Sequence, residues 1–116
     1  MSIVRSGNAT SKYAEGAVVV HTVLIRLRTD ADKVEVNELT ERLLALGEAT
    51  CVPGGFVVGP NVTEEPLDQG YDFGFVFTFP NKGALDAYHV NPAHVGVSLA
   101  IRSLAETILV FDFDSA

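Results

Sequence analysis

The 116-residue sequence predicts an α+β domain with the ferredoxin-like split β-α-β-β-α-β arrangement. Four segments show the two-residue alternation of strands, and helical stripes separate the first from the second and the third from the fourth. The length allows one hydrophobic core. Hydrophobic residues make up 47% of the chain, so one face of the four-stranded antiparallel sheet is left apolar without a cover. We therefore expect a homodimer in which two sheets pack together as a dimeric α+β barrel.

Residues 1–16 are small and polar, and we expect a flexible leader ahead of a single domain over residues 17–116. The first strand is predicted from Ala17 to Arg28, where both faces are rich in aliphatic side chains, so we expect cover on both sides. Asp30 or Asp32 is the predicted cap of the helix that follows. The apolar stripe of this helix has spacings of three and four residues: Val36, Leu39, Leu43 and Leu46.

Two more strands are predicted on either side of a polar loop over residues 60–70. The first covers residues 56–59, and the second, over residues 71–79, has the strongest strand pattern in the chain. Every second residue of this strand is aromatic, which indicates a row of core side chains: Tyr71, Phe73, Phe75, Phe77 and Phe79. The last strand is predicted over residues 107–113.

The second helical region is predicted in two pieces. Asn81 caps a short helix, and Asn91 followed by Pro92 is a strong start for the next one. In this last helix, His94 falls on the same inward face as three aliphatic residues: Val97, Ile101 and Leu104.

Composition excludes several classes of function. The chain has 8 basic and 15 acidic residues, a net charge of −7, without a basic stripe, so we expect no nucleic-acid partner. Its apolar runs are too short for a membrane span. Cys51 is the single cysteine and the start of the chain lacks the pattern of a signal peptide, so we expect a cytoplasmic protein. Nucleotide-binding motifs are absent and the histidines lack zinc-ligand spacing, so we expect neither cofactor nor metal.

Three side chains are candidates for catalysis. Burial and the positive end of a helix dipole both disfavour a charged imidazole at His94, which would leave it neutral and able to act as a general base. Tyr88 can hydrogen-bond to this ring or donate to a substrate oxygen, and His21 can join them from the first strand. The alternative is that His94 is a core histidine bonded to Tyr88, and that His21 is structural as well. The pattern does not decide whether His89 is buried.

Several short motifs together resemble the stress-responsive A/B barrel (Dabb) domain family from about residue 18 to residue 114. They are His21-Thr22-Val23-Leu24, Gly70-Tyr71-Asp72, Ala87-Tyr88, Asn91-Pro92-Ala93-His94-Val95 and Val110-Phe111-Asp112-Phe113. The resemblance implies a dimeric α+β barrel. The family includes olivetolic acid cyclase-like polyketide cyclases, which use no cofactor.

The resemblance also implies roles for particular residues. His94 matches the proposed base of those cyclases, Tyr88 the assisting tyrosine, and His21 a histidine on the first strand. This chain has Asn91 where related members have a histidine, which changes the polarity beside the base. A non-polar ligand tail would suit a pocket lined by apolar side chains: Phe73, Phe75 and Ile101.

Three functions follow as hypotheses. The first is a stress-responsive barrel protein of undefined activity, a homodimer with a small apolar-ligand pocket near His94. The second is a cofactor-independent polyketide cyclase, a lyase that performs intramolecular aldol closure with His94 as the general base. The third is a structural or assembly role without a ligand.

Overall fold

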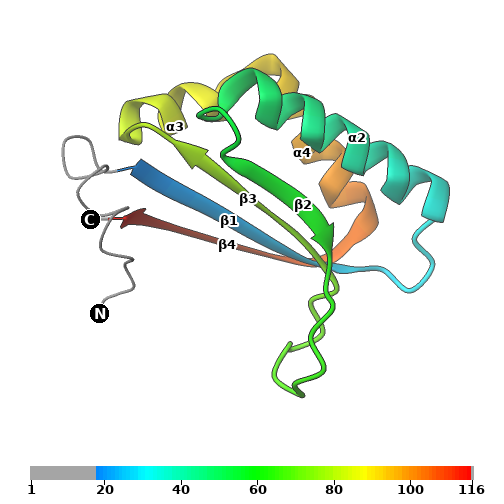
Figure 1. Ribbon diagram of the computed structural model, residues 1–116. Helices are drawn as coiled ribbons and strands as arrows, with labels where there is room; N and C mark the ends of the chain where they lie inside the picture. The colour runs from blue at the N-terminus through cyan, green and yellow to red at the C-terminus, as the bar shows by residue number, and fades with distance from the viewer. Residues whose placement is uncertain (1–17, 116) are drawn as a thin grey trace.

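A computed structural model describes residues 18–115 of the chain, and the predicted leader over residues 1–16 lies outside the described residues (Figure 1). The elements follow the predicted order, with the second helical region divided into two helices. Their bounds are β1 (Val18–Leu27), α2 (Lys33–Thr50), β2 (Phe56–Pro60), β3 (Phe73–Phe79), α3 (Lys82–His89), α4 (Pro92–Leu104) and β4 (Ala105–Ser115).

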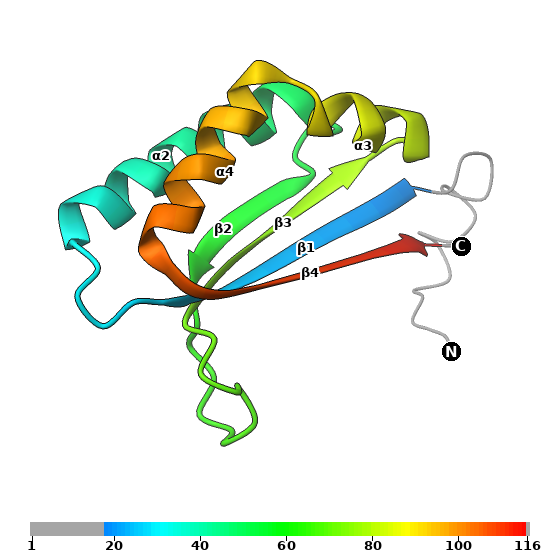
Figure 2. The same cartoon turned by 180° about the vertical axis from the view of Figure 1, so that it is seen from behind.

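The four strands form one antiparallel sheet in the order β2-β3-β1-β4. Strand β1 lies between β3 and β4, and its Thr22 pairs with Val76 on one side and Phe111 on the other. All three helices lie on the same side of the sheet, so the described part of the chain has two layers (Figures 1 and 2). This is the ferredoxin-like α+β arrangement that the sequence predicted.

The core lies between the sheet and the helices. The phenylalanine side chains of β3 are buried there, as the aromatic row predicted. The stripes of the two long helices meet them from above, and their buried members are Leu39, Leu43 and Leu46 of α2 and Val97, Ile101 and Leu104 of α4. The ring of Phe77, which is 0% exposed, lies at the centre of this layer.

Each helix begins at a side-chain cap that could be identified in the sequence. Asp32 accepts a hydrogen bond from the backbone nitrogen of Val34, which selects it over Asp30 as the cap of α2. Asn81 and Asn91 cap α3 and α4 in the same way, with oxygen-to-nitrogen distances of 2.8 Å. A capping side chain satisfies a backbone donor that has no partner within the helix, so these residues fix where the helices start.

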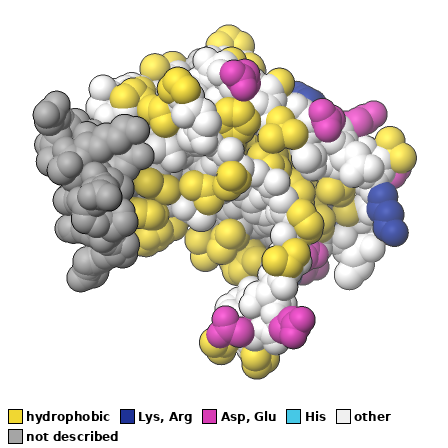
Figure 3. Space-filling view, viewed as in Figure 1, with side chains coloured by type: hydrophobic (Ala, Val, Ile, Leu, Met, Phe, Trp, Pro, Cys, Tyr) yellow, Lys and Arg dark blue, Asp and Glu magenta, His cyan; other side chains and the backbone are white. Residues whose placement is uncertain are grey.

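The opposite face of the sheet has no helix over it, so within one chain the described part of β1 is covered on one side only. We call this surface the open face, and its apolar members are Val20, Leu24, Val57, Val76, Leu109, Phe111 and Phe113. Phe111 is 59% exposed and Phe113 is 45% exposed, and the centroids of their rings are 5.8 Å apart. Hydrophobic side chains gather along the lower side of the molecule in Figure 3, beneath the sheet.

Candidate functional site

Four side chains from three elements meet near one end of the sheet. His21 comes from β1, Tyr88 and His89 from the end of α3, and His94 from the first turn of α4. The ring centroids of Tyr88 and His94 are 4.5 Å apart, those of His21 and Tyr88 5.6 Å, and those of His89 and His94 5.4 Å. We call these four residues the histidine cluster. The three residues selected from the sequence thus lie together, and His89 joins them.

The hydrogen bond made by His94 fixes the tautomer of its imidazole ring. Its Nδ1 atom lies 3.1 Å from the backbone oxygen of His89. A carbonyl oxygen can only accept, so Nδ1 carries the hydrogen and Nε2 keeps a free lone pair. Burial lowers the pKa of His94 below its ordinary value, the carbonyl hydrogen bond opposes this shift, and the neighbouring His89 and His21 add to it. The ring is therefore neutral near pH 7, with Nε2 as its basic atom.

Tyr88 is a hydrogen-bond donor, whereas Nε2 of His94 is an acceptor. Tyr88 is 3% exposed, and its ring centroid lies 4.9 Å from that of Phe79 and 5.8 Å from that of Phe77. This burial raises the pKa of Tyr88 well above its ordinary value, so the hydroxyl stays protonated and can donate a hydrogen bond. The rings of Tyr88 and His94 are in contact, but no hydrogen bond joins them. The bond from His94 goes to the backbone of His89 instead.

His21 is held by a partner that the sequence analysis did not select. Its Nδ1 atom lies 2.6 Å from Oδ1 of Asp112, and the two residues are direct cross-strand neighbours in β1 and β4. The side chain of His21 is 4% exposed and that of Asp112 is 34% exposed. The sequence alternation of β4 could have identified Asp112 as a candidate. It puts Asp112 on the face opposite Phe111 and Phe113, and therefore on the side of the sheet that carries the helices.

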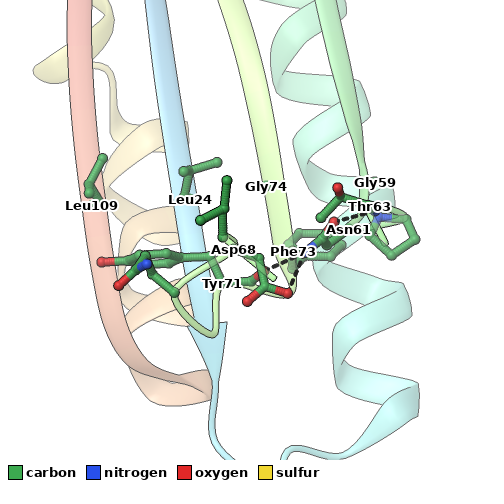
Figure 4. Close-up of a pocket in the computed structure, with 12 residues that line it drawn as sticks. Leu24, Gly59, Asn61, Thr63, Asp68, Tyr71, Phe73, Gly74 and Leu109 are labelled. Carbon is green, nitrogen blue, oxygen red and sulfur yellow. Dashed lines mark hydrogen bonds between the residues drawn. The ribbon is translucent and has the colours of Figure 1, made fainter. Parts of the chain in front are cut away.

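One hollow lies at the other end of the sheet, on the open face. It has a volume of about 450 Å³, and Figure 4 shows Leu24 and Leu109 on adjacent strands beside the loop that precedes β3. A second hollow, of about 470 Å³, lies beside the loop after β1. Neither hollow includes a residue of the histidine cluster. Of the three side chains expected to contact a ligand, Phe73, Phe75 and Ile101, all belong to the core, and Phe73 also lines the hollow on the open face.

The described residues, 18–115, contain neither a cluster of metal ligands nor a membrane-spanning helix. No group of three or more histidine, cysteine, aspartate or glutamate side chains in this range is placed to hold a metal ion. No helix in this range is both long enough and apolar enough to cross a bilayer.

Comparison with known proteins gives the relationship that this geometry suggests. The sequence profile of the Stress responsive A/B Barrel Domain, abbreviated Dabb, matches residues 19–115. The chain belongs to the Dabb family. Its resemblance to that family, inferred from five short motifs, is confirmed over nearly the whole described range.

Two relatives align with this chain over 95 residues each. Olivetolic acid cyclase from Cannabis sativa is 24% identical, and the alignment covers 82% of this chain and 94% of that protein. The stress-response A/B barrel domain-containing protein HS1 from Arabidopsis thaliana is 28% identical over 82% of this chain and 87% of its own length. Among solved structures, a dimeric ferredoxin-like protein of unknown function from Jannaschia sp. CCS1 is 27% identical, with a TM-score of 0.66. That comparison covers 83% of this chain and 97% of the other.

Proposed function

We propose that this Dabb protein is a homodimer that binds a small, largely apolar molecule at the histidine cluster. The observation that carries the proposal is the contact between Tyr88 and His94, whose ring centroids are 4.5 Å apart. One ring offers a protonated hydroxyl and the other a free Nε2 lone pair, so the pair can bind a carbonyl or an acidic carbon–hydrogen group. Such a pair beside an apolar wall is typical of small-molecule sites.

The homodimer is supported by the open face. Seven apolar side chains stand on it, and a contiguous apolar surface of this kind on a soluble protein marks a contact site. The similar protein from Jannaschia is dimeric. We propose that two copies pack open face to open face to give the α+β barrel, with the two helical layers on the outside.

The ligand approaches through the accessible members of the cluster. His89 is exposed and His94 is half-buried, whereas His21 and Tyr88 are almost completely enclosed. The ring of Phe75 lies 6.2 Å from that of His21, so the apolar wall begins directly beside the cluster. In this proposal the ligand's tail lies against the predicted apolar set: Phe73, Phe75 and Ile101. Because these side chains are buried in the core, the tail must displace them slightly when it binds.

A second function, cofactor-independent aldol closure of a poly-β-keto thioester, is favoured by the opposite pKa shifts of the same pair. His94 Nε2 takes a proton from a methylene between two carbonyls, and the resulting enolate carbon attacks a carbonyl further along the substrate. The Tyr88 hydroxyl donates a hydrogen bond to the oxygen under attack. The protonated His94 then returns its proton to the new alkoxide, which restores the enzyme. Olivetolic acid cyclase, one of the relatives, supports this class of reaction.

A tetraketide thioester tests both functions. Binding is measured by titrating the wild-type protein with it and recording the NMR resonances of the histidine ring nitrogens. Reaction is measured as the ratio of cyclised products. We expect His94→Gln to lower the cyclisation rate by roughly 10²–10⁴-fold, the usual contribution of a general base. We expect Tyr88→Phe to lower it too, whereas Tyr71→Phe, the same change at a site outside the cluster, serves as the matched control.

The outcomes separate the two functions. Binding that shifts the His94 resonances without turnover supports the binding function and excludes the cyclase for this substrate class. Product ratios unchanged by His94→Gln also exclude the cyclase. If the thioester shifts no cluster resonance, the ligand site at the histidine cluster is wrong. Sedimentation equilibrium gives the assembly state, and a monomer at all concentrations would contradict the homodimer.

A further inference from the structure

His89 is the member of the histidine cluster to which the proposed function gives no chemical role. Its ring centroid lies 5.4 Å from that of His94, 5.7 Å from that of His21 and 5.6 Å from that of Tyr88. It is therefore beside each of the other three side chains at once. His89 is exposed, whereas His94 is half-buried and the other two are almost completely enclosed. Its ring is thus the contact of the cluster with solvent.

The turn between α3 and α4 holds His89 and His94 next to each other. His89 is the last residue of α3, and α4 begins at Pro92, so a linker of two residues joins the helices. The backbone nitrogen of Asn91 donates to the backbone oxygen of Tyr88 at 3.1 Å, and the Asn91 side chain caps α4. The hydrogen bond from Nδ1 of His94 to the backbone oxygen of His89 is a third link across this turn. The backbone therefore keeps the two side chains together.

Two imidazole rings at this separation do not readily carry a proton each. A histidine side chain in water gains its proton as the pH falls through about 6.5, and a second positive charge about 5.4 Å away is repelled by the first. The first proton goes to the exposed ring, because burial disfavours a charge on the half-buried ring of His94. Repulsion by His89 adds to this burial in lowering the pKa of His94.

The other ionisable groups near the two rings are paired or uncharged. They are His21 of β1, Asp112 of β4, Lys82, Asp86 and Tyr88 of α3, and Cys51 after α2. Two contacts of 2.6 Å join the first four into the pairs His21–Asp112 and Lys82–Asp86. Burial raises the pKa of Tyr88 and of Cys51, so both stay protonated and neutral. In the part of the chain that the structure describes, no ion pair joins His89 to a carboxylate.

We propose that His89 is a positioning residue of the histidine cluster, which keeps its neighbour His94 in the neutral form. Its backbone oxygen selects the tautomer of His94, and its exposed ring takes the proton that would otherwise go to Nε2. This role rests on the proposed ligand site and adds its regulation by pH. The two rings hold one proton between them, on the solvent side, and the free lone pair of His94 stays available in mildly acidic solution.

Titration of the individual histidine rings tests the proposal. The ligand-free protein, labelled with nitrogen-15 at histidine, is titrated from about pH 8 to about pH 5 in about 0.1 M salt, and the midpoint of His94 is read from its ring resonances. We expect His89→Gln to raise this midpoint by roughly 0.5–1 pH unit. This is the repulsion between two charges about 5.4 Å apart in a medium with a dielectric constant of about 40–80.

His89→Lys separates the effect of charge from that of packing. Lysine supplies a positive charge at this position without the imidazole ring, so we expect the His94 midpoint to stay within about 0.3 unit of the wild-type value or to fall below it. Lys82→Gln is the matched control, since it removes a positive charge from the same helix. Lys82 lies seven residues before His89, roughly 10 Å along α3 and about one Debye length away. We expect a shift of less than about 0.3 unit.

Binding of the tetraketide thioester measures the consequence for the site. At about pH 5 we expect His89→Gln to bind it roughly three- to tenfold more weakly than the wild type, because less of its His94 is neutral. At about pH 7.5, where His94 is neutral in both proteins, we expect equal binding. A thioester that does not bind contradicts the proposed function alone, since the His94 midpoint is measured without a ligand.

Two results would overturn the role of His89. One is a His94 midpoint that His89→Gln leaves unchanged. The other is a midpoint that His89→Gln and His89→Lys raise equally, which would indicate packing in place of charge. Backbone amide spectra show whether His89→Gln has kept the fold. If it has not, the wild-type protein decides the question: a rise from about 0.05 M to about 0.5 M salt should raise the His94 midpoint by screening the repulsion, and an unchanged midpoint overturns the proposal.

Discussion

Removing the carboxylate of Asp112 tests whether the buried pair with His21 stabilises the fold. The 2.6 Å contact joins a ring that is almost fully enclosed to a carboxylate that is about one-third exposed. A hydrogen bond to a charged group contributes roughly 1.5–3 kcal/mol, and partial exposure of Asp112 puts this one near the lower end. We therefore expect Asp112→Ala to lower the free energy of unfolding by about 1.5 kcal/mol, because it leaves the His21 Nδ1–H buried without an acceptor.

The same strand supplies the matched control. Asp114 lies two residues further along, on the same face of β4, and is exposed, so we expect Asp114→Ala to change stability by less than about 0.5 kcal/mol. Urea denaturation at pH 7.5 and one protein concentration gives both values. Asp112 lies on the helix side of the sheet, so dimer contacts through the open face are not altered directly. Equal effects of the two substitutions would refute the reasoning.

A double-mutant cycle isolates the pair itself. His21→Gln and Asp112→Ala are measured singly and together, and the difference from additivity is the coupling energy. We expect a coupling of about 1 kcal/mol or more, since each single variant removes the same hydrogen bond. Additive effects would mean that the two side chains are neighbours without a stabilising interaction.

Three further predictions concern the core, a pH dependence and a helix cap. Phe77→Ala should lower the free energy of unfolding by about 3–5 kcal/mol in urea, whereas Val34→Ala, on the exposed side of α2, should cost far less. Because the pKa of His94 is lowered in the folded state, the unfolded chain takes up its proton first as the pH falls through 6.5. Stability should therefore decrease below that pH, and His94→Gln should flatten this part of the profile. Asn91→Ala should lower the melting temperature through loss of about 1 kcal/mol of capping, and Asn37→Ala, inside α2, is its control; equal shifts would contradict the cap.

The elements of this fold could be predicted because local interactions specify them. Asn81 and Asn91 cap their helices through hydrogen bonds that span two or three residues. The alternating phenylalanines of β3 fix which side of that strand is buried, since neighbouring side chains of a strand point to opposite faces. The loop after β2 ends later than predicted: β3 begins at Phe73 rather than at residue 71. The side chain of Asp72 instead accepts a hydrogen bond from the backbone nitrogen of Leu27.

The sequence by itself determined the strands, the helices, the sidedness of the sheet and the selection of His94, Tyr88 and His21 as candidates. Only the tertiary structure decided how those side chains combine. His21 and Asp112 are 91 residues apart, and their hydrogen bond depends on the pairing register of β1 with β4. The hollow on the open face, lined by Gly59 and Gly74, likewise depends on the register of β2 with β3. Register is a long-range property of the sheet, so a periodic pattern gives the face of each side chain without giving its partner.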